Sequence, residues 1–170
     1  HLHETDSISG DALYLGYGVH KTILPYTLQD RYTREKQERH VKAAILENDI
    51  LRAVFLPEYG GRLWSLYHKV RKRELLFRNP VLQFGNLAIR NAWFAGGVEW
   101  NFGMIGHSPF TCSPVFCEQL TDSETGTPVL RFYEWERVRR QCYEIDAYLP
   151  DGSEFLLVRM NIKNCLDEPS

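Results

Sequence analysis

The sequence lacks the features that define several large classes of protein. Its 20 lysines and arginines are balanced by 22 aspartates and glutamates, giving a formal net charge of −2. Nucleic-acid-binding domains normally gather a basic excess on one face, so this balance argues against a nucleic-acid partner. No apolar run approaches the roughly 20 residues of a membrane-spanning helix, and residues 1–10 contain no apolar secretion signal. We therefore expect a soluble, cytoplasmic chain without a membrane partner.

Motifs for metals, nucleotides and serine nucleophiles are also missing. The four cysteines form no Cys-x-x-Cys pair, and the six histidines do not approach them at zinc-finger spacing. The pair Gly96-Gly97 lacks the lysine of a phosphate-binding loop, and there is no Gly-x-Ser-x-Gly elbow. We expect reduced cysteines, no metal and no cofactor. The pair His1 and His3 is either native or an addition from cloning, and the sequence does not distinguish the two.

Helical patterns are scarce, whereas strand patterns are abundant. The polar stretch 29–40 has no apolar stripe at helical spacing, which predicts an extended or one-turn surface connector. Elsewhere apolar residues alternate in short runs bounded by turn residues, typical of antiparallel strands. The last run is apolar on both faces, which predicts a strand buried between two layers. The expected strands are 41–45, 50–56, 62–68, 74–77, 129–136, 138–149 and 154–163.

One segment, 78–114, concentrates glycines and aromatic side chains in a chain with 22 aromatic residues (9 Phe, 9 Tyr and 4 Trp). Long loops of this kind are often functional, so we predict a site here. The indoles of Trp93 and Trp100 offer flat apolar faces for a sugar ring, and Glu99 and His107 can transfer protons. The alternative is that these aromatic residues only pack a corner of the fold.

A family resemblance rests on five stretches of the sequence. Residues 46–66 resemble the opening of a galactose-mutarotase-like (aldose 1-epimerase-like) domain. Residues 77–80, 93–101 and 106–109 are similar to the DUF5107 family of bacterial proteins, often found ahead of tetratricopeptide repeats, and 135–164 fit the same pattern. The resemblance implies an all-β antiparallel sandwich, the amino-terminal portion of a supersandwich over residues 40–170, after an extended segment 1–39. It also implies a carbohydrate ligand.

The resemblance implies binding more directly than a reaction. Mutarotases use a histidine acid and a glutamate base, and both motifs would follow Asn164, so we expect this chain, which stops at Ser170, to be incomplete as a catalyst. His107 falls near the substrate-binding histidine of the superfamily, with Glu99 beside it.

We therefore predict carbohydrate recognition, and the residues leave open whether a reaction is catalysed. Trp93 and Trp100 stack on sugar faces, and polar side chains bind hydroxyls; in an enzymatic version Glu99 or His107 exchanges the proton. The predicted hydroxyl-binding residues are Arg78, Asn79, Arg90, Glu99, Asn101 and His107.

Two alternative functions stay open. Glu134, Glu136 or Glu144 could pair with Glu99 in a glycoside hydrolase completed by further sequence. The sandwich could instead be a non-catalytic interaction module. Open strand edges would favour a homo-oligomer, and a tetratricopeptide-repeat segment would accompany the domain in a longer protein. The sugar, the oligomeric state and the sequence after Ser170 in the source gene cannot be read from these residues.

Overall fold

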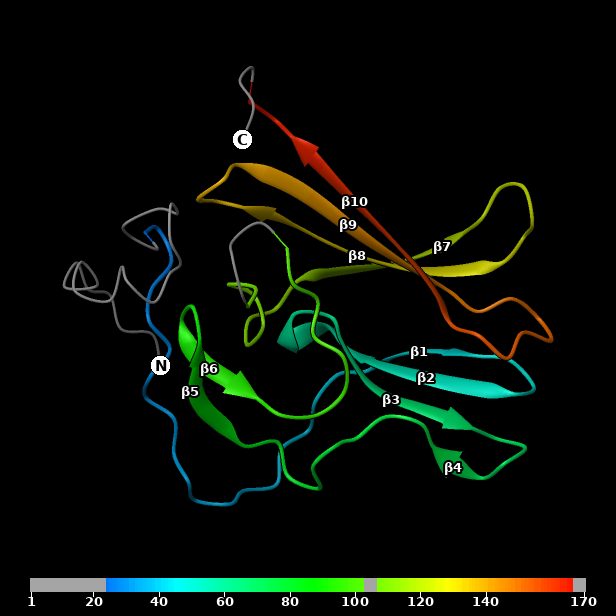
Figure 1. The fold of residues 1–170 in the computed structure, drawn as a ribbon, viewed down its shortest axis with the longest axis horizontal. Coiled ribbons are helices and arrows are strands. Elements are labelled where there is room, and N and C mark those ends of the chain that lie inside the picture. The colour runs from blue at the N-terminus through cyan, green and yellow to red at the C-terminus, as the bar shows by residue number, and fades with distance from the viewer. Residues whose placement is uncertain (1–23, 103–106, 167–170) are drawn as a thin grey trace.

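The structure, a computed structural model, describes residues 24–102 and 107–166. The regular elements in these ranges are antiparallel strands and one 3-10 turn, η3 (Pro57–Tyr59), which confirms the expected all-β fold (Figure 1). His1, His3 and Gly106 lie outside the described residues. The strands are β1 (Ala44–Glu47), β2 (Leu51–Leu56), β3 (Arg62–His68), β4 (Arg73–Glu74), β5 (Phe84–Ala88), β6 (Asn91–Phe94), β7 (Phe116–Thr121), β8 (Pro128–Glu136), β9 (Gln141–Tyr148) and β10 (Leu157–Asn164).

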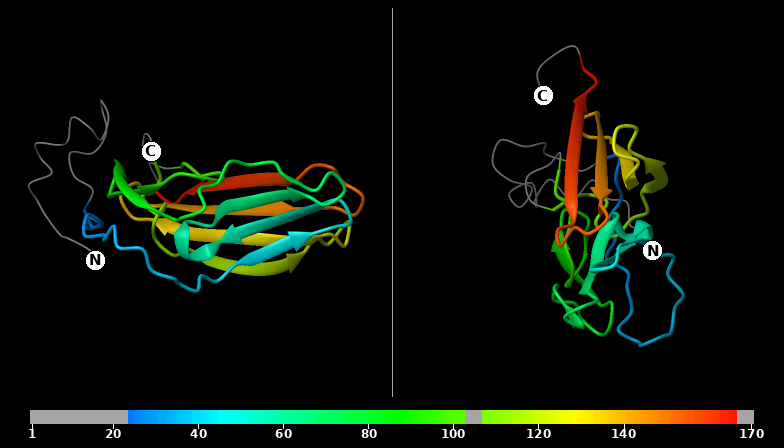
Figure 2. Two further views of the ribbon diagram at one scale, coloured as in Figure 1. Left: turned by 90° about the horizontal axis from the view of Figure 1, so that it is seen from below. Right: turned by 90° about the vertical axis from the view of Figure 1, so that its right-hand side faces the viewer.

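Two four-stranded sheets form the two layers of the molecule (Figure 2). One has the strand order β1-β2-β3-β4 and the other β10-β9-β8-β7, while β5 and β6 form a separate hairpin. Phe55 of the first sheet and Phe132 of the second are fully buried, with ring centroids 5.2 Å apart. Full burial of such a side chain contributes roughly 1.5–3 kcal/mol, so the inner faces of both sheets supply the core. The core includes Leu46, Leu51, Ala53, Phe55, Leu63, Leu130, Phe132, Tyr143, Ile145 and Ala147.

Asn48 joins the ends of the two sheets. Its side-chain Oδ1 accepts hydrogen bonds from the backbone N–H groups of Ile50 (2.9 Å) and Leu51 (2.7 Å) and so shapes the β1–β2 turn. Its Nδ2 donates to the carbonyl oxygens of Pro150 (2.8 Å) and Ser153 (3.0 Å) in the β9–β10 turn. The asparagine that shapes the β1–β2 turn therefore also joins the two layers.

The glycine- and aromatic-rich segment is more regular than predicted. Residues 78–114 contain the β5–β6 hairpin, and the next strand, β7, was not predicted either. The hairpin turns at Ile89 and Arg90. Asn91, the first residue of β6, has a φ of +70°, and Phe94 at the end of the strand is fully buried. Asparagine tolerates this left-handed conformation, and the glycines on either side hide the alternating pattern of the two short strands.

Strand β10 does not lie between two layers, and that prediction is wrong. All eight of its residues are exposed. Val158, Met160 and Ile162 pair in register with the buried β9 residues that face the core, yet they are 41%, 37% and 49% exposed. β10 is the outermost strand of its sheet, and nothing in the described ranges covers its core-side face.

The connector before β1 has no helix in residues 24–40, as predicted for 29–40. Its beginning packs on the sandwich, because Tyr26 is 5% exposed and its hydroxyl donates to Glu136 Oε1 at 3.0 Å. The same hydroxyl accepts the backbone N–H of Arg137 at 2.8 Å. Across residues 24–102 and 107–166, no helix has the length and apolarity needed to cross a membrane.

Candidate functional site

Arg62 is the buried centre of the candidate site. It opens β3, and its side chain is 3% exposed. The guanidinium donates to the carbonyl oxygens of Phe94 (2.8 Å) and Gly96 (3.0 Å) and to Thr111 Oγ1 (2.7 Å), and its Nη2 lies 3.8 Å from Glu99 Oε2. Burial lowers the pKa of Arg62, while Glu99 opposes that shift. Arg62 thus brings a positive charge beside the carboxylate.

Sequence reasoning missed Arg62, although a signal for it exists. The residue stands at the start of an apolar strand and directly precedes Leu63. Arginine is almost never fully buried without a partner, so a strand of this kind predicts an acidic or carbonyl partner nearby.

Gly97 positions the segment that carries Glu99. The backbone of Val98 pairs with β3, with hydrogen bonds of 2.8 and 3.2 Å to and from Leu63, and the Gly97 N–H donates to the Phe77 carbonyl at 2.7 Å. Gly97 has a φ of +68°, and a Cβ on it would overlap the backbone oxygen of Leu63. Only glycine allows the backbone at position 97 to come this close to Leu63. The close contact places Glu99 beside Arg62.

Several polar groups of the site contact a single carboxylate oxygen of Glu99. Its Oε2 accepts a hydrogen bond from Trp93 Nε1 at 2.9 Å and lies 2.9 Å from His107 Nδ1. The side chain is 12% exposed, and its buried Oε1 has no hydrogen-bond partner among the described residues. The recess beside it, between Arg62 and Trp100, has about 170 Å³ of empty volume and is too narrow for a sugar ring.

The outer part of the site consists of two rings. His107 is 30% exposed, and a neutral imidazole facing a carboxylate through Nδ1 carries its proton there, which leaves Nε2 as an acceptor. The ring centroids of Trp93 and His107 lie 6.0 Å apart with planes tilted by 52°. Opposite Trp93 in the hairpin stands Gly85, so no cross-strand side chain covers the indole from that position.

Trp100 and Asn101 support the loop around this cluster. Trp100 Nε1 donates to the Gly61 carbonyl at 2.8 Å, and its indole packs against the core. Asn101 Oδ1 accepts the backbone N–H of Ser108 at 3.1 Å. The first bond holds Trp100 to the turn before β3, and the second ties Asn101 to the residue that follows His107.

Arg90 makes its hydrogen bonds to residues outside the Glu99 cluster. It is 7% exposed, and its guanidinium donates to the carbonyl oxygens of Thr27 (2.7 Å) and Pro109 (3.3 Å) and to Ser113 Oγ (2.7 Å). Burial lowers its pKa. These bonds tie the amino-terminal connector to the loop after Pro109.

Arg78 and Asn79 border the site through the backbone. Arg78 forms an isolated bridge with Gly96, but its side chain is 51% exposed and its Nε lies 4.0 Å from Glu74 Oε2. Asn79 is half-buried.

The other carboxylates considered for an acid pair have structural partners. Glu136 is fully buried, and it accepts hydrogen bonds from the Tyr26 hydroxyl and from two backbone N–H groups of the following turn. Glu134 and Glu144 each form an ion pair with an arginine. Among the residues that the structure describes, no group of three or more His, Cys, Asp and Glu side chains could hold a metal ion.

Two comparisons place the chain among known proteins. The sequence profile of DUF5107, a domain of unknown function, matches residues 19–167. The crystal structure of a TPR-domain containing protein from Parabacteroides distasonis ATCC 8503 is similar, with a TM-score of 0.73 and 26% sequence identity. The match covers 81% of this chain and 23% of that protein, so the chain spans about a quarter of its length.

Proposed function

We propose that this chain, which belongs to the DUF5107 family, recognises carbohydrate through the surface formed by Trp93, Glu99 and His107. The observation that carries the proposal is the single carboxylate oxygen that contacts both ring nitrogens at 2.9 Å. Because Glu99 engages the edges of the two rings, the imidazole keeps Nε2 and the indole keeps one flat face for a ligand. That face is the one turned away from Arg62, whose guanidinium lies over the ring at 6.0 Å from its centroid. A pyranose needs this combination of an apolar plane and polar groups at its rim.

The ligand that suits this surface is a neutral sugar. Glu99 brings a negative charge to it, and Arg62 lies 3.8 Å from the same oxygen, so the pair adds no net charge at the centre of the site. A neutral hexose can stack on Trp93 and donate a hydroxyl to His107 Nε2. The recess beside Glu99 is too narrow for the ring, so the sugar lies on the outer side of the two aromatic groups.

The wider proposal is a galactose-mutarotase-like sandwich within a larger carbohydrate-active protein that includes tetratricopeptide repeats. The two-layer antiparallel architecture and the likeness to a much longer TPR-domain containing protein support it. Within the described residues the site has one imidazole–carboxylate pair, and both groups are bound to each other. Anomer exchange needs a separate acid and base, so we expect polarimetry on this chain to show no acceleration.

The proposal is tested by calorimetric titration of the chain with galactose and glucose. Replacing His107→Ala removes the hydroxyl acceptor, and Glu99→Gln removes the charge that orients both rings; each change is expected to weaken binding by about tenfold. Glu144→Gln, which changes a carboxylate on β9, serves as the matched control and should bind as the unmodified chain does. Thermal unfolding must show that all three variants are folded.

Two results would contradict the proposal. One is no heat of binding with either sugar at saturating concentrations, and the other is equal affinity in the folded His107→Ala and Glu144→Gln chains.

A second candidate, a non-catalytic interaction module, is favoured by β10. Its core-side residues Val158, Met160 and Ile162 are exposed although they continue the buried face of β9. An apolar, unpaired edge strand is a template for a second strand, and the partner we propose is a second copy of this chain. Light scattering should then give a dimer that Met160→Lys converts to a monomer; a concentrated, unmodified chain that stays monomeric would contradict this.

A further inference from the structure

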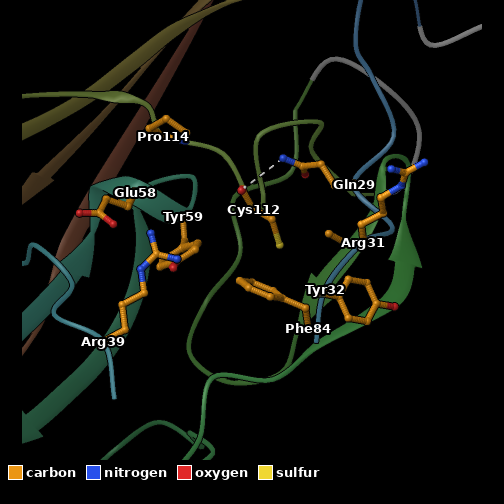
Figure 3. Close-up of a pocket in the computed structure, with 10 residues that line it drawn as sticks. Gln29, Arg31, Tyr32, Arg39, Glu58, Tyr59, Phe84, Cys112 and Pro114 are labelled. Atoms are coloured by element: carbon orange, nitrogen blue, oxygen red, sulfur yellow. Dashed lines mark hydrogen bonds between the residues drawn. The ribbon is translucent and has the colours of Figure 1, made fainter. Parts of the chain in front are cut away.

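A pocket of about 420 Å³ lies outside the Glu99 cluster, and none of the predicted sugar-binding residues lines it. It forms where the amino-terminal connector passes the β5–β6 hairpin and the η3 turn, as the labelled side chains in Figure 3 show. Gln29, Tyr32 and Arg39 come from the connector, and Tyr59 and Phe84 from the other side. Tyr59 also lines the recess beside Glu99, so the pocket and the recess share one lining residue.

Aromatic rings form the apolar part of this pocket. The centroid of Phe84 lies 5.8 Å from that of Tyr59 and 6.3 Å from that of Tyr32, and both pairs are tilted by 50–57°. The Tyr32 hydroxyl is held by a hydrogen bond to Asn86 Oδ1, which orients its ring. A ring of a ligand can therefore lie between side chains that already have defined orientations.

The connector gives the pocket a polar, positively charged side. Its lining includes Arg31 and Arg39 and one carboxylate, Glu58, which leaves one net positive charge. Arg39 forms no hydrogen bond or ion pair with any residue of the described ranges, and its guanidinium lies beside Tyr59 in Figure 3. Its charge lowers the pKa of the Tyr59 hydroxyl, although burial has the larger effect and raises it.

Cys112 adds no charge to the pocket. Burial raises the pKa of its thiol to about 12, so the sulfur stays protonated near neutral pH. The Gln29 amide is oriented by donating from Nε2 to Ser113 Oγ at 3.0 Å. The arginines are thus the groups of the lining that can recognise a charged ligand.

We propose that this pocket binds a small organic monocarboxylate that carries a six-membered ring, with the carboxylate at Arg39 and the ring against Phe84 and Tyr32. Guanidinium groups match the planar carboxylate, and one net positive charge suits a monoanion better than a phosphate dianion. The volume suits one or two rings. This site does not depend on the sugar-binding proposal, because its lining includes neither Trp93 nor His107.

Two classes of ligand are monocarboxylates with a six-membered ring, the sugar acids and the aromatic acids. The experiment distinguishes between them. Calorimetric titration of the whole chain uses glucuronate and benzoate, with glucose, benzyl alcohol and acetate as probes that lack the charge or the ring. At least one ring acid is expected to bind at about 10 mM, where even a Kd of about 1 mM is detected. Binding of only one of the two identifies the source.

Substitutions test whether the ring acid binds in this pocket. Arg39→Gln is expected to weaken binding by about tenfold or more, since it removes a charge-assisted contact. Arg34→Gln is the matched control, because Arg34 is an exposed arginine of the same connector outside the pocket lining, and it should leave binding unchanged. Phe84→Leu should weaken ring acids and leave any weak acetate binding as it is.

The proposal is overturned if neither ring acid binds, if acetate binds as tightly as the ring acids, or if Arg39→Gln and Arg34→Gln bind equally well. The Glu99→Gln chain distinguishes the two sites. It should lose affinity for neutral hexose and keep its affinity for the ring acid.

Discussion

Asp146 is a buried carboxylate on the outer face of the sheet formed by β7 to β10. Its side chain is 1% exposed, and it accepts hydrogen bonds from Arg131 Nε (2.7 Å) and Nη2 (2.8 Å) and from Arg159 Nη2 (2.9 Å). Hydrogen bonds from Arg131, followed by those from Arg159 and Tyr148, lower the pKa of Asp146 from 3.8 to about 2, against the opposing effect of burial. The carboxylate thereby joins β8, β9 and β10.

This shift predicts a pH dependence of stability. Because the pKa is lower in the folded chain, the ionised carboxylate stabilises the fold above about pH 4, and this stabilisation is lost as the pH falls to about 2. The pKa difference corresponds to about 2 kcal/mol. Urea unfolding should show Asp146→Asn less stable than the unmodified chain by about that amount at pH 7, with the gap closing toward pH 2, whereas Glu144→Gln should change stability little. A gap that is the same at both pH values would contradict the assignment.

Gly97 is the backbone position on which the site depends. Its φ of +68° and the contact with the Leu63 oxygen both exclude a side chain. Gly97→Ala should lower the free energy of unfolding by at least about 2 kcal/mol. Gly85→Ala is the matched control, since a Cβ there meets no atom within 4 Å, and its effect should stay within about 1 kcal/mol. Equal effects in chemical denaturation would show that the close approach to β3 is wrong.

At the scale of single residues, the sequence predicts three side chains of the Glu99 site. It misses Arg62, for a physical reason. Trp93, Glu99 and His107 were predicted from their residue types, and the structure brings them together. Arg62 stands far from them in the sequence and meets Glu99 only through the pairing of Leu63 with Val98. Arg90 was predicted as a sugar ligand, yet the structure gives its guanidinium carbonyl and hydroxyl partners, which no local pattern reveals.

At the scale of secondary-structure elements, substitutions in β9 and β10 test whether β9 is buried and β10 exposed. Ile145 and Met160 pair in register and belong to the same face of the sheet, but Ile145 is fully buried whereas Met160 and its neighbour Ile162 are exposed. Ile145→Ala should lower the free energy of unfolding by about 2–5 kcal/mol, and Ile162→Ala by less than about 1 kcal/mol. Similar losses in dilute samples would mean that β10 is covered in solution.

The alternation of apolar and polar residues predicts strands well where turn residues bound them and less well elsewhere. β2 and β3 occur where their apolar runs predict them. β5 and β6 were missed because Gly85 and the short strand lengths weaken the period of two, and β7 because five of its six residues are exposed. The exposure of β10 could not be predicted, since it depends on which strands the opposite sheet places above it.

For the molecule as a whole, two candidate sites share one lining residue, Tyr59. The Glu99 cluster combines rings with a charge-paired carboxylate, and the pocket beyond Tyr59 combines rings with a net positive charge. We propose a neutral sugar for the first and a ring acid for the second. If both proposals hold, the chain binds a neutral and an acidic ligand at separate sites.

The central claim is that neutral sugar binds at Trp93, Glu99 and His107, and NMR of the tryptophan side chains tests it most directly. The chain has four tryptophans, so its four indole N–H signals can be assigned one by one. Titration with galactose or glucose should shift the Trp93 indole signal and the His107 ring signals and leave that of Trp135, on β8, unchanged. In Glu99→Gln the sugar concentration that gives half of the shift should rise about tenfold. If the Trp93 signal stays in place at saturating sugar, or shifts at the same sugar concentrations in folded Glu99→Gln, the claim is wrong.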